Sequence, residues 1–159
     1  MSETMMRWPD AIATLAAERT RAETGVRLLK RHAGQDAAAL SRGELAYTDA
    51  KAEMDAVIRG LTVVLAERGA PPDLPAVERR LTLGVKAREA FCRQVMALVP
   101  EDPGTRDLLV PLLSVVLPSL LEAAKTLYTG WTGQDSLTRQ TIQSQLEATT
   151  WTPFADLTP

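Results

Sequence analysis

Histidine and cysteine, two residue types that often act in catalysis and metal binding, occur once each in this chain of 159 residues, as His32 and Cys92. His32 is the only histidine, which excludes a pair of histidines on one zinc ion and the His-Glu-x-x-His motif. It follows Lys30 and Arg31 and precedes Gly34, and basic residues ahead of a glycine are typical of a helix end. We therefore interpret His32 as a cation at a helix terminus.

Cys92 is the only cysteine, so the chain has no intrachain disulfide, and this usage is typical of a reducing compartment. Arg88 lies one helical turn earlier and could lower the pKa of the thiol. However, Cys92 shares a helical stripe with Leu81, Val85 and Val95, where a thiol usually behaves as a small apolar group. The sequence favours a structural role for Cys92.

Motifs for other chemistry are missing from the sequence. The diiron pattern Glu-x-x-His fails because residue 29 is leucine, and no GxSxG, P-loop or GxGxxG sequence occurs. Acidic and basic residues four apart, such as Glu23 with Arg27 and Asp55 with Arg59, are typical of solvated helix faces. We predict no catalytic residue, no metal site and no cofactor.

Arg88 provides the best indication of a small-molecule site. A guanidinium on an otherwise apolar stripe needs either an acidic partner or an anionic ligand. The candidate ligand pocket consists of Arg88, Tyr47, Met54 and Phe91. A protein carboxylate on Arg88 would remove the reason for expecting an anion there.

Four of the seven aromatic residues lie near the carboxyl terminus, namely Tyr128, Trp131, Trp151 and Phe154. Large rings with polar tips are favoured at interfaces, and a Trp-x-x-Phe segment near prolines could anchor another protein. The alternative is that these rings dock on their own bundle. The four residues form the candidate interaction site.

Basic residues are densest in two predicted helices, and they could form one patch for phosphate polymers if those helices are neighbours. No helix-turn-helix signature or set of stacking aromatics accompanies them, so nucleic acid is not favoured as a partner. The candidate patch consists of Arg19, Arg27, Arg31, Arg79 and Arg80.

These candidate residues lie on segments with helical periodicity. Pro9 suits a first helical turn and predicts a helix over 9–32. Ser41 and Glu44 form a capping box that predicts the start of the next helix, which ends near Gly69. Three further helices are predicted, from Asp73 to the turn at 101–105, from about 105 to 129, and from about 136 to 149.

The segment over 108–121 is the most apolar of the chain, and Pro111 and Pro118 interrupt it. On a helix both prolines share one polar strip with Ser114, while leucines and valines cover the remaining circumference. About 14 uncharged residues extend roughly 21 Å, which is too short for a hydrocarbon core of about 30 Å. We therefore predict that 105–129 is the central helix of a bundle, without a membrane span.

These patterns together predict an all-α domain, an antiparallel bundle of about five helices over 1–150, with an aromatic, proline-containing tail over 151–159. The tail is expected to dock on the bundle or on a partner. The first residues do not resemble a signal peptide, so we expect a cytoplasmic protein, and the excess of arginine over lysine is common in bacteria with GC-rich genomes.

We expect a noncatalytic interaction or regulatory module that binds another protein or itself as a homo-oligomer. A small-molecule sensor or carrier is the alternative, and a nucleic-acid-binding protein is the second alternative.

Overall fold

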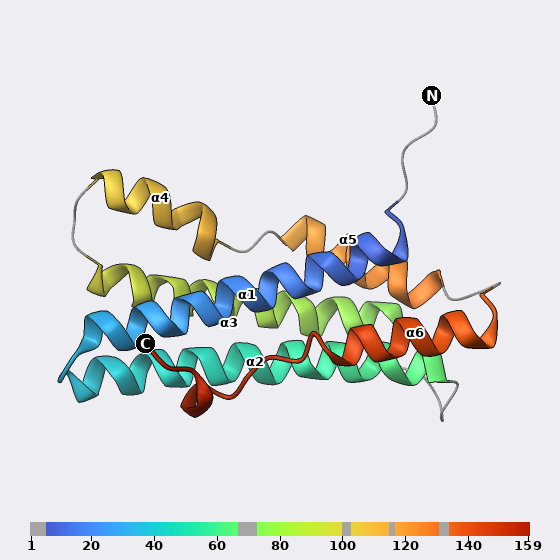
Figure 1. The fold of residues 1–159 in the computed structure, drawn as a ribbon, viewed down its shortest axis with the longest axis horizontal. Helices are drawn as coiled ribbons and strands as arrows, with labels where there is room; N and C mark the ends of the chain where they lie inside the picture. Colours follow the sequence, from blue (N-terminus) through green and yellow to red (C-terminus); the bar gives the residue numbers. More distant parts are fainter. Residues whose placement is uncertain (1–5, 67–72, 100–102, 115–116, 131–133) are drawn as a thin grey trace.

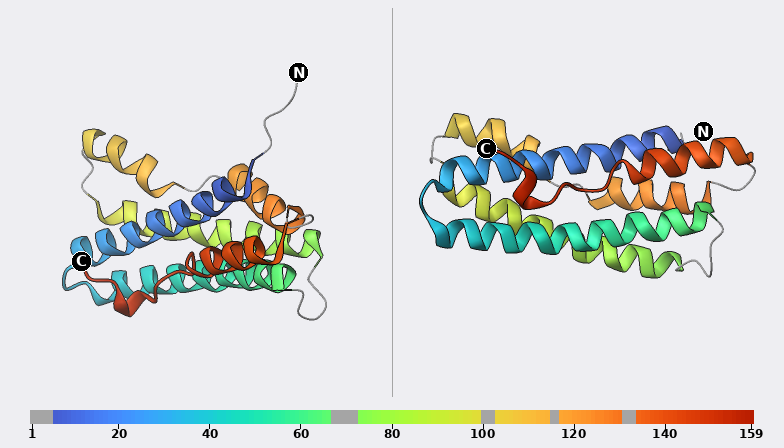
Figure 2. Two further views of the ribbon diagram at one scale, coloured as in Figure 1. Left: turned by 45° about the vertical axis from the view of Figure 1, so that its right-hand side comes forward. Right: turned by 60° about the horizontal axis from the view of Figure 1, so that its bottom comes forward.

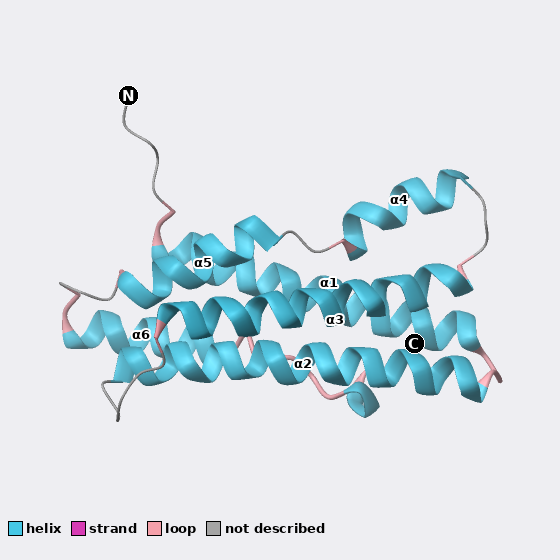
Figure 3. Cartoon of the chain, turned by 180° about the vertical axis from the view of Figure 1, so that it is seen from behind, coloured by secondary structure: helices cyan, strands magenta, loops and turns pink. Residues whose placement is uncertain are grey.

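The computed structural model describes residues 6–66, 73–99, 103–114, 117–130 and 134–159. Within these ranges the protein is all-helical, as the sequence predicted, and Figure 3 shows only helices and loops in this part of the chain. The elements in chain order are α1 (Trp8–Ala33), α2 (Ala37–Ala66), α3 (Leu74–Leu98), α4 (Pro103–Leu113), α5 (Leu117–Thr129), α6 (Ser136–Glu147) and the short 3₁₀ turn η1 (Phe154–Asp156).

Helix α1 has the bounds that its sequence predicted within one residue. Pro9 lies in its first turn, and Lys30, Arg31 and His32 lie in its last. Gly34 follows with a φ of 55°, a conformation that glycine adopts without the steric cost of a side chain. Its place in this tight turn lets α2 fold back along α1 (Figure 1).

Helix α2 begins before the predicted capping box. The Asp36 carboxylate accepts a hydrogen bond from the Ala39 amide at 3.0 Å, so this residue caps the helix. Ser41 and Glu44 lie exposed inside α2, and the predicted start at Ser41 is therefore wrong. Asp73 and Asp135 cap α3 and α6 in the same way as Asp36 caps α2.

The first three helices alternate in direction and pack side by side, with α2 between α3 and α6 (Figures 1 and 2). α5 lies against α1 and α3. Close helix approach needs glycine at Gly43, where an added Cβ would lie 2.2 Å from a methyl carbon of Leu29. The largest buried apolar side chains of the core include Trp151, Tyr47, Phe91, Leu15, Leu29, Met54, Leu61, Leu81, Leu113, Leu127 and Ile142.

The continuous helix predicted over 105–129 is wrong. α4 ends at Leu113, Ser114 is not helical, and α5 begins at Leu117, so six α-helices replace the predicted five within the described residues. Pro118 lies in the first turn of α5. Amides in the first turn have no partner within the helix, so the missing amide hydrogen of proline costs no helical hydrogen bond.

The two halves of this segment differ in burial. α5 buries Leu120 and Leu127 in the core, whereas α4 packs mainly against α1 and leaves Val110 48% exposed. Figure 1 shows α4 standing off from the rest of the bundle at one end of the molecule. α5 therefore buries one face against the bundle and exposes the other, and the central position predicted for the segment is not confirmed. No helix in the described ranges is both long and apolar enough to cross a membrane.

Candidate functional site

A buried ion pair joins α1 to α3 in the middle of the bundle. The Arg88 Nε donates to the Glu18 Oε1 at 2.6 Å, and each side chain is 1% exposed. Burial raises the pKa of Glu18, and the charge of Arg88 opposes that shift. Because the Glu18 carboxylate already pairs with the Arg88 guanidinium, the reason for expecting an anionic ligand there is removed.

Arg88 also links the pair to the broken segment. Its Nη2 donates to the carbonyl oxygen of Leu113, the last residue of α4. In a continuous helix this carbonyl would accept from the amide of Leu117. A cation at a helix carboxyl terminus is also favoured by the helix dipole. Arg88 therefore stabilises the end of α4 at the break.

The residues of the predicted pocket come together, but the chain's own tail fills the space beside them. The centre of the Tyr47 ring lies 5.5 Å from that of the Phe91 ring and 5.5 Å from that of the Trp151 ring. Trp151 is 2% exposed, and Met54 is also 2% exposed, beside Gly84 of α3. The candidate pocket and half of the candidate interaction site are thus one aromatic cluster.

The tail over 151–159 runs between α1 and α2, as the right-hand view of Figure 2 shows. Tyr47 donates from its hydroxyl to the Thr152 carbonyl at 2.6 Å. Lys30 donates to the carbonyls of Phe154 at 2.6 Å and Leu157 at 2.5 Å, and its ammonium lies 4.4 Å from the centre of the Phe154 ring. Side chains of the bundle therefore bind the main chain of the tail.

Two carboxylates complete these contacts with the tail. Glu23 accepts from the Thr152 hydroxyl at 2.7 Å, and Asp55 accepts from the Trp151 amide at 3.3 Å. We call Glu23, Lys30, Tyr47 and Asp55 the tail site. Burial raises the pKa of the Tyr47 hydroxyl, and the nearby carboxylates of Glu23 and Asp55 raise it further. Tyr47 therefore stays protonated and remains a hydrogen-bond donor.

The other two aromatics of the candidate interaction site are separate from the tail. Tyr128 is half-buried at the end of α5, which lies at the opposite end of the molecule from the carboxyl terminus (Figure 1). Trp131 lies outside the described residues.

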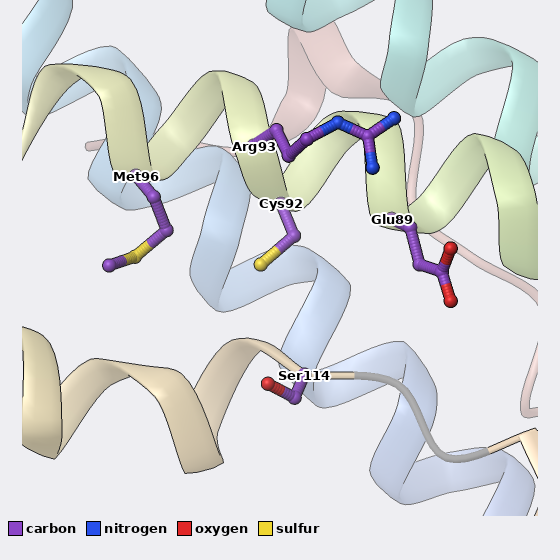
Figure 4. Close-up of a pocket in the computed structure, with 5 residues that line it drawn as sticks. All are labelled: Glu89, Cys92, Arg93, Met96 and Ser114. Atoms are coloured by element: carbon purple, nitrogen blue, oxygen red, sulfur yellow. The ribbon is translucent and has the colours of Figure 1, made fainter.

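A second feature is an open cleft of about 330 Å³ between α3 and the end of α4, which we call the α3/α4 cleft. Its lining residues are Glu89, Cys92, Arg93, Met96 and Ser114. Figure 4 shows Cys92 and Met96 pointing from α3 toward the side of Ser114, while Arg93 extends along α3 and away from it. The spacing of 89, 92, 93 and 96 places four of the five residues on one face of α3.

Arginines bridge α3 and α4 at both ends of this cleft. Arg106 of α4 donates to the Met96 carbonyl at 3.2 Å, and Arg88 of α3 donates to the Leu113 carbonyl. The two helices make little direct contact between these bridges. These two hydrogen bonds therefore join α3 to α4 on either side of the cleft.

Cys92 is half-buried in this cleft. Burial raises the pKa of its thiol, although Arg88 and Arg93 oppose the shift. The thiol is therefore protonated at neutral pH and contributes an apolar surface, in line with the structural role that the sequence favoured.

The basic residues do not form a single patch. Arg19 donates to the Ala148 carbonyl, and Arg80 pairs with Glu53 at 3.4 Å. Arg27 and Arg31 are exposed in the last part of α1, and Arg79 is exposed in the first part of α3. These two parts lie at opposite ends of the molecule (Figure 1).

Glu18 was not identified from the sequence as a buried carboxylate, nor was Lys30 identified as a hydrogen-bond donor to the tail. Glu18 lies between Leu15 and Ala22 on the buried stripe of α1, and this helical spacing could have identified it as a buried carboxylate. Lys30 carries no such signal, because its contacts are to residues more than 120 positions away.

In the part of the chain that the structure describes, no three His, Cys, Asp or Glu side chains gather as metal ligands would. Comparison with known proteins finds no matching family model, no matching curated protein and no matching solved structure.

Proposed function

We propose that this protein is a noncatalytic interaction module that associates with a second copy of itself through the α3/α4 cleft. The observation that carries the proposal is the open cleft of about 330 Å³ between α3 and the end of α4. Helices in a closed core pack with axes about 8–10 Å apart and interdigitated side chains. An open space along an otherwise well-packed helix is typical of a surface that receives side chains from another molecule.

The cleft combines an apolar floor with a charged rim. Met96 and Cys92 supply the floor, and methionine adapts its shape to a partner more readily than branched side chains do. Val110 on α4 is an exposed apolar residue one helical turn before Ser114, which lines the cleft. A surface of this kind is suited to bind an apolar side chain of a partner helix.

The charges on the rim favour a second copy as the partner. Glu89 and Arg93 are exposed on α3 one turn apart, so the face carries one acidic and one basic residue. In a two-fold symmetric dimer, each contact between two different residues occurs twice. Two copies can therefore pair Glu89 of each chain with Arg93 of the other. The formal net charge of −2 adds little repulsion between copies.

Molar mass measured by sedimentation over a range of protein concentrations tests this proposal. We expect the wild-type chain to move from monomer toward dimer as concentration rises. Val110→Glu should weaken association by at least about tenfold, because the interface would have to bury an unpaired charge. Leu137→Glu is the matched control, since Leu137 is 74% exposed on α6 and should leave association unchanged.

Two outcomes would reject the proposal. One is a wild-type chain that stays monomeric at every concentration, and the other is equal weakening by Val110→Glu and Leu137→Glu.

A second candidate function is binding of a small apolar molecule in the same cleft. Its volume of about 330 Å³ lies within the range of ligand pockets, and Ser114 offers a hydroxyl opposite Cys92 and Met96. The fluorescent probe N-phenyl-1-naphthylamine tests this function. Fluorescence that rises with wild-type protein and is lost with Met96→Glu would support a ligand site, and no rise would reject it.

A further inference from the structure

We infer that the tail site is a peptide-recognition site for an extended Trp-x-Pro-Phe segment, and that the chain's own tail is a ligand bound in cis. This inference goes beyond the proposed function, because it concerns the tail site on α1 and α2 and not the α3/α4 cleft.

The bundle binds the tail through the tail's main-chain carbonyls. Its last residues form only the short turn η1 and do not pack as a helix. The carbonyls of Thr152, Phe154 and Leu157 accept from the side chains of Tyr47 and Lys30. Recognition of a peptide's main chain by fixed side chains, with pockets for its larger side chains, is the usual physics of peptide binding.

The residues of the tail site lie on two well-packed helices, α1 and α2. Tyr47 is fully buried in the complex with the tail, and its ring also packs against Phe91 of α3, with the ring centres 5.5 Å apart. Glu23, Lys30 and Asp55 lie on α1 and α2, which have regular helical structure over their described lengths. Since α1 and α2 also pack on each other and on α3, we expect the recognising groups to keep their positions and to receive the same segment from another molecule.

The contacts concentrate at two aromatic side chains of the tail, Trp151 and Phe154, which we call the anchors. Trp151 stacks on Tyr47 with an interplanar angle of 28°, and Phe154 lies under the ammonium of Lys30. Pro153 separates the anchors and limits the conformations of the free peptide. Aromatic anchors in fixed surroundings carry most of the affinity in many interfaces.

The covalent link keeps the site occupied. A short flexible connection gives a tethered ligand an effective concentration of about 1 mM or more. An external peptide therefore binds the intact chain poorly, and the site becomes accessible once the tail is cut or displaced.

Cutting the tail after folding tests the inference. A specific protease site is inserted between Glu147 and Ala148, which are both exposed, and the full-length protein is cleaved once it has folded. We expect the released segment to stay bound during gel filtration. A labelled synthetic peptide of residues 148–159 should then replace it, whereas the same peptide with Trp151→Ala and Phe154→Ala should bind at least about tenfold more weakly.

Receptor variants provide the matched control. Lys30→Met in the cleaved protein should weaken peptide binding by about tenfold, because two charge-assisted hydrogen bonds and the contact with Phe154 are lost. Lys86→Met, at an exposed position of α3, should leave peptide binding unchanged.

Three results would overturn the inference. The bundle could unfold when the tail is cut, which would make the tail a part of the core. The folded bundle could fail to take up the labelled peptide even at millimolar concentration. The peptide without its two anchors could also bind as well as the natural sequence.

Discussion

The Glu18–Arg88 pair is the residue-scale feature on which the arrangement of α4 depends. It connects α1 to α3, and through the Leu113 carbonyl it also connects α3 to the end of α4. Two charges with 1% exposure are costly to bury, and their mutual contact, together with the hydrogen bond from Arg88 to the Leu113 carbonyl, offsets that cost. Removing one partner should therefore destabilise the fold far more than removing both.

Substitution of the pair tests this reasoning. Arg88→Met should lower the free energy of unfolding by about 3–5 kcal/mol, because Glu18 would remain buried without a counter-charge. The double variant Glu18→Met with Arg88→Met should recover at least half of that loss. Urea denaturation measures both effects. Arg80→Met, which breaks the exposed pair with Glu53, is the control and should cost less than about 1 kcal/mol.

Cys92 gives a prediction on pH dependence. Burial raises the pKa of its thiol in the folded chain, so the folded state holds less thiolate than the unfolded state at the same pH. Alkylation by iodoacetamide at pH 8 should be slower in the native protein than in urea, and the native rate should keep rising above pH 9. Mass spectrometry measures the modified fraction. A native rate equal to that in urea at every pH would contradict the raised pKa.

The same shift has a consequence for stability. The contribution of Cys92 is fully present below the thiol's ordinary pKa of 9.0 and is lost as the pH rises through the higher pKa of the folded state. Replacement by alanine should remove this part of the alkaline pH dependence.

At the scale of elements, the sequence predicted helices where local signals decide the structure. Pro9 and the basic residues at 30–32 gave both ends of α1, and Asp73 gave the start of α3. The start of α2 was missed because Asp36 follows so closely after Gly34 that it resembles a loop residue. A nearby S-x-x-E pattern is only one way to cap a helix.

The break between α4 and α5 could not be predicted from periodicity. On a helical wheel the apolar face continues past position 114, and Ser114 falls with both prolines on the polar strip. The wheel takes no account of Arg88, which lies 25 residues away and takes up the Leu113 carbonyl. A long-range contact therefore favours a break between α4 and α5 that the local sequence pattern does not predict.

Replacement of Pro118 separates these two causes. If Arg88 maintains the break, Pro118→Ala should change the free energy of unfolding by less than about 1 kcal/mol, through the unfolded state alone. Helical content measured by circular dichroism should not rise. A rise in helical content would instead show that the proline alone prevents a continuous helix.

At the scale of the whole molecule, the sequence identified individual candidate residues but did not predict that they lie together in the fold. Tyr47, Phe91, Trp151 and Phe154 were assigned to two separate sites, and the structure makes them one cluster. Their sequence separation exceeds 100 residues in the case of Tyr47 and Trp151, so only tertiary packing can join them. In this structure Trp151 and Phe154 of the chain's own tail lie against the Tyr47 ring, which sequence patterns alone could not show.

The central claim is that this cleft is the contact surface between two copies, and concentration-dependent hydrogen exchange tests it most directly. Exchange is followed at low and high protein concentration, residue by residue. The proposal predicts that amides over 89–96 and 103–113 exchange more slowly at high concentration, while those of α6 do not change. Equal exchange at both concentrations over 89–96 and 103–113, or protection confined to another surface, would contradict it.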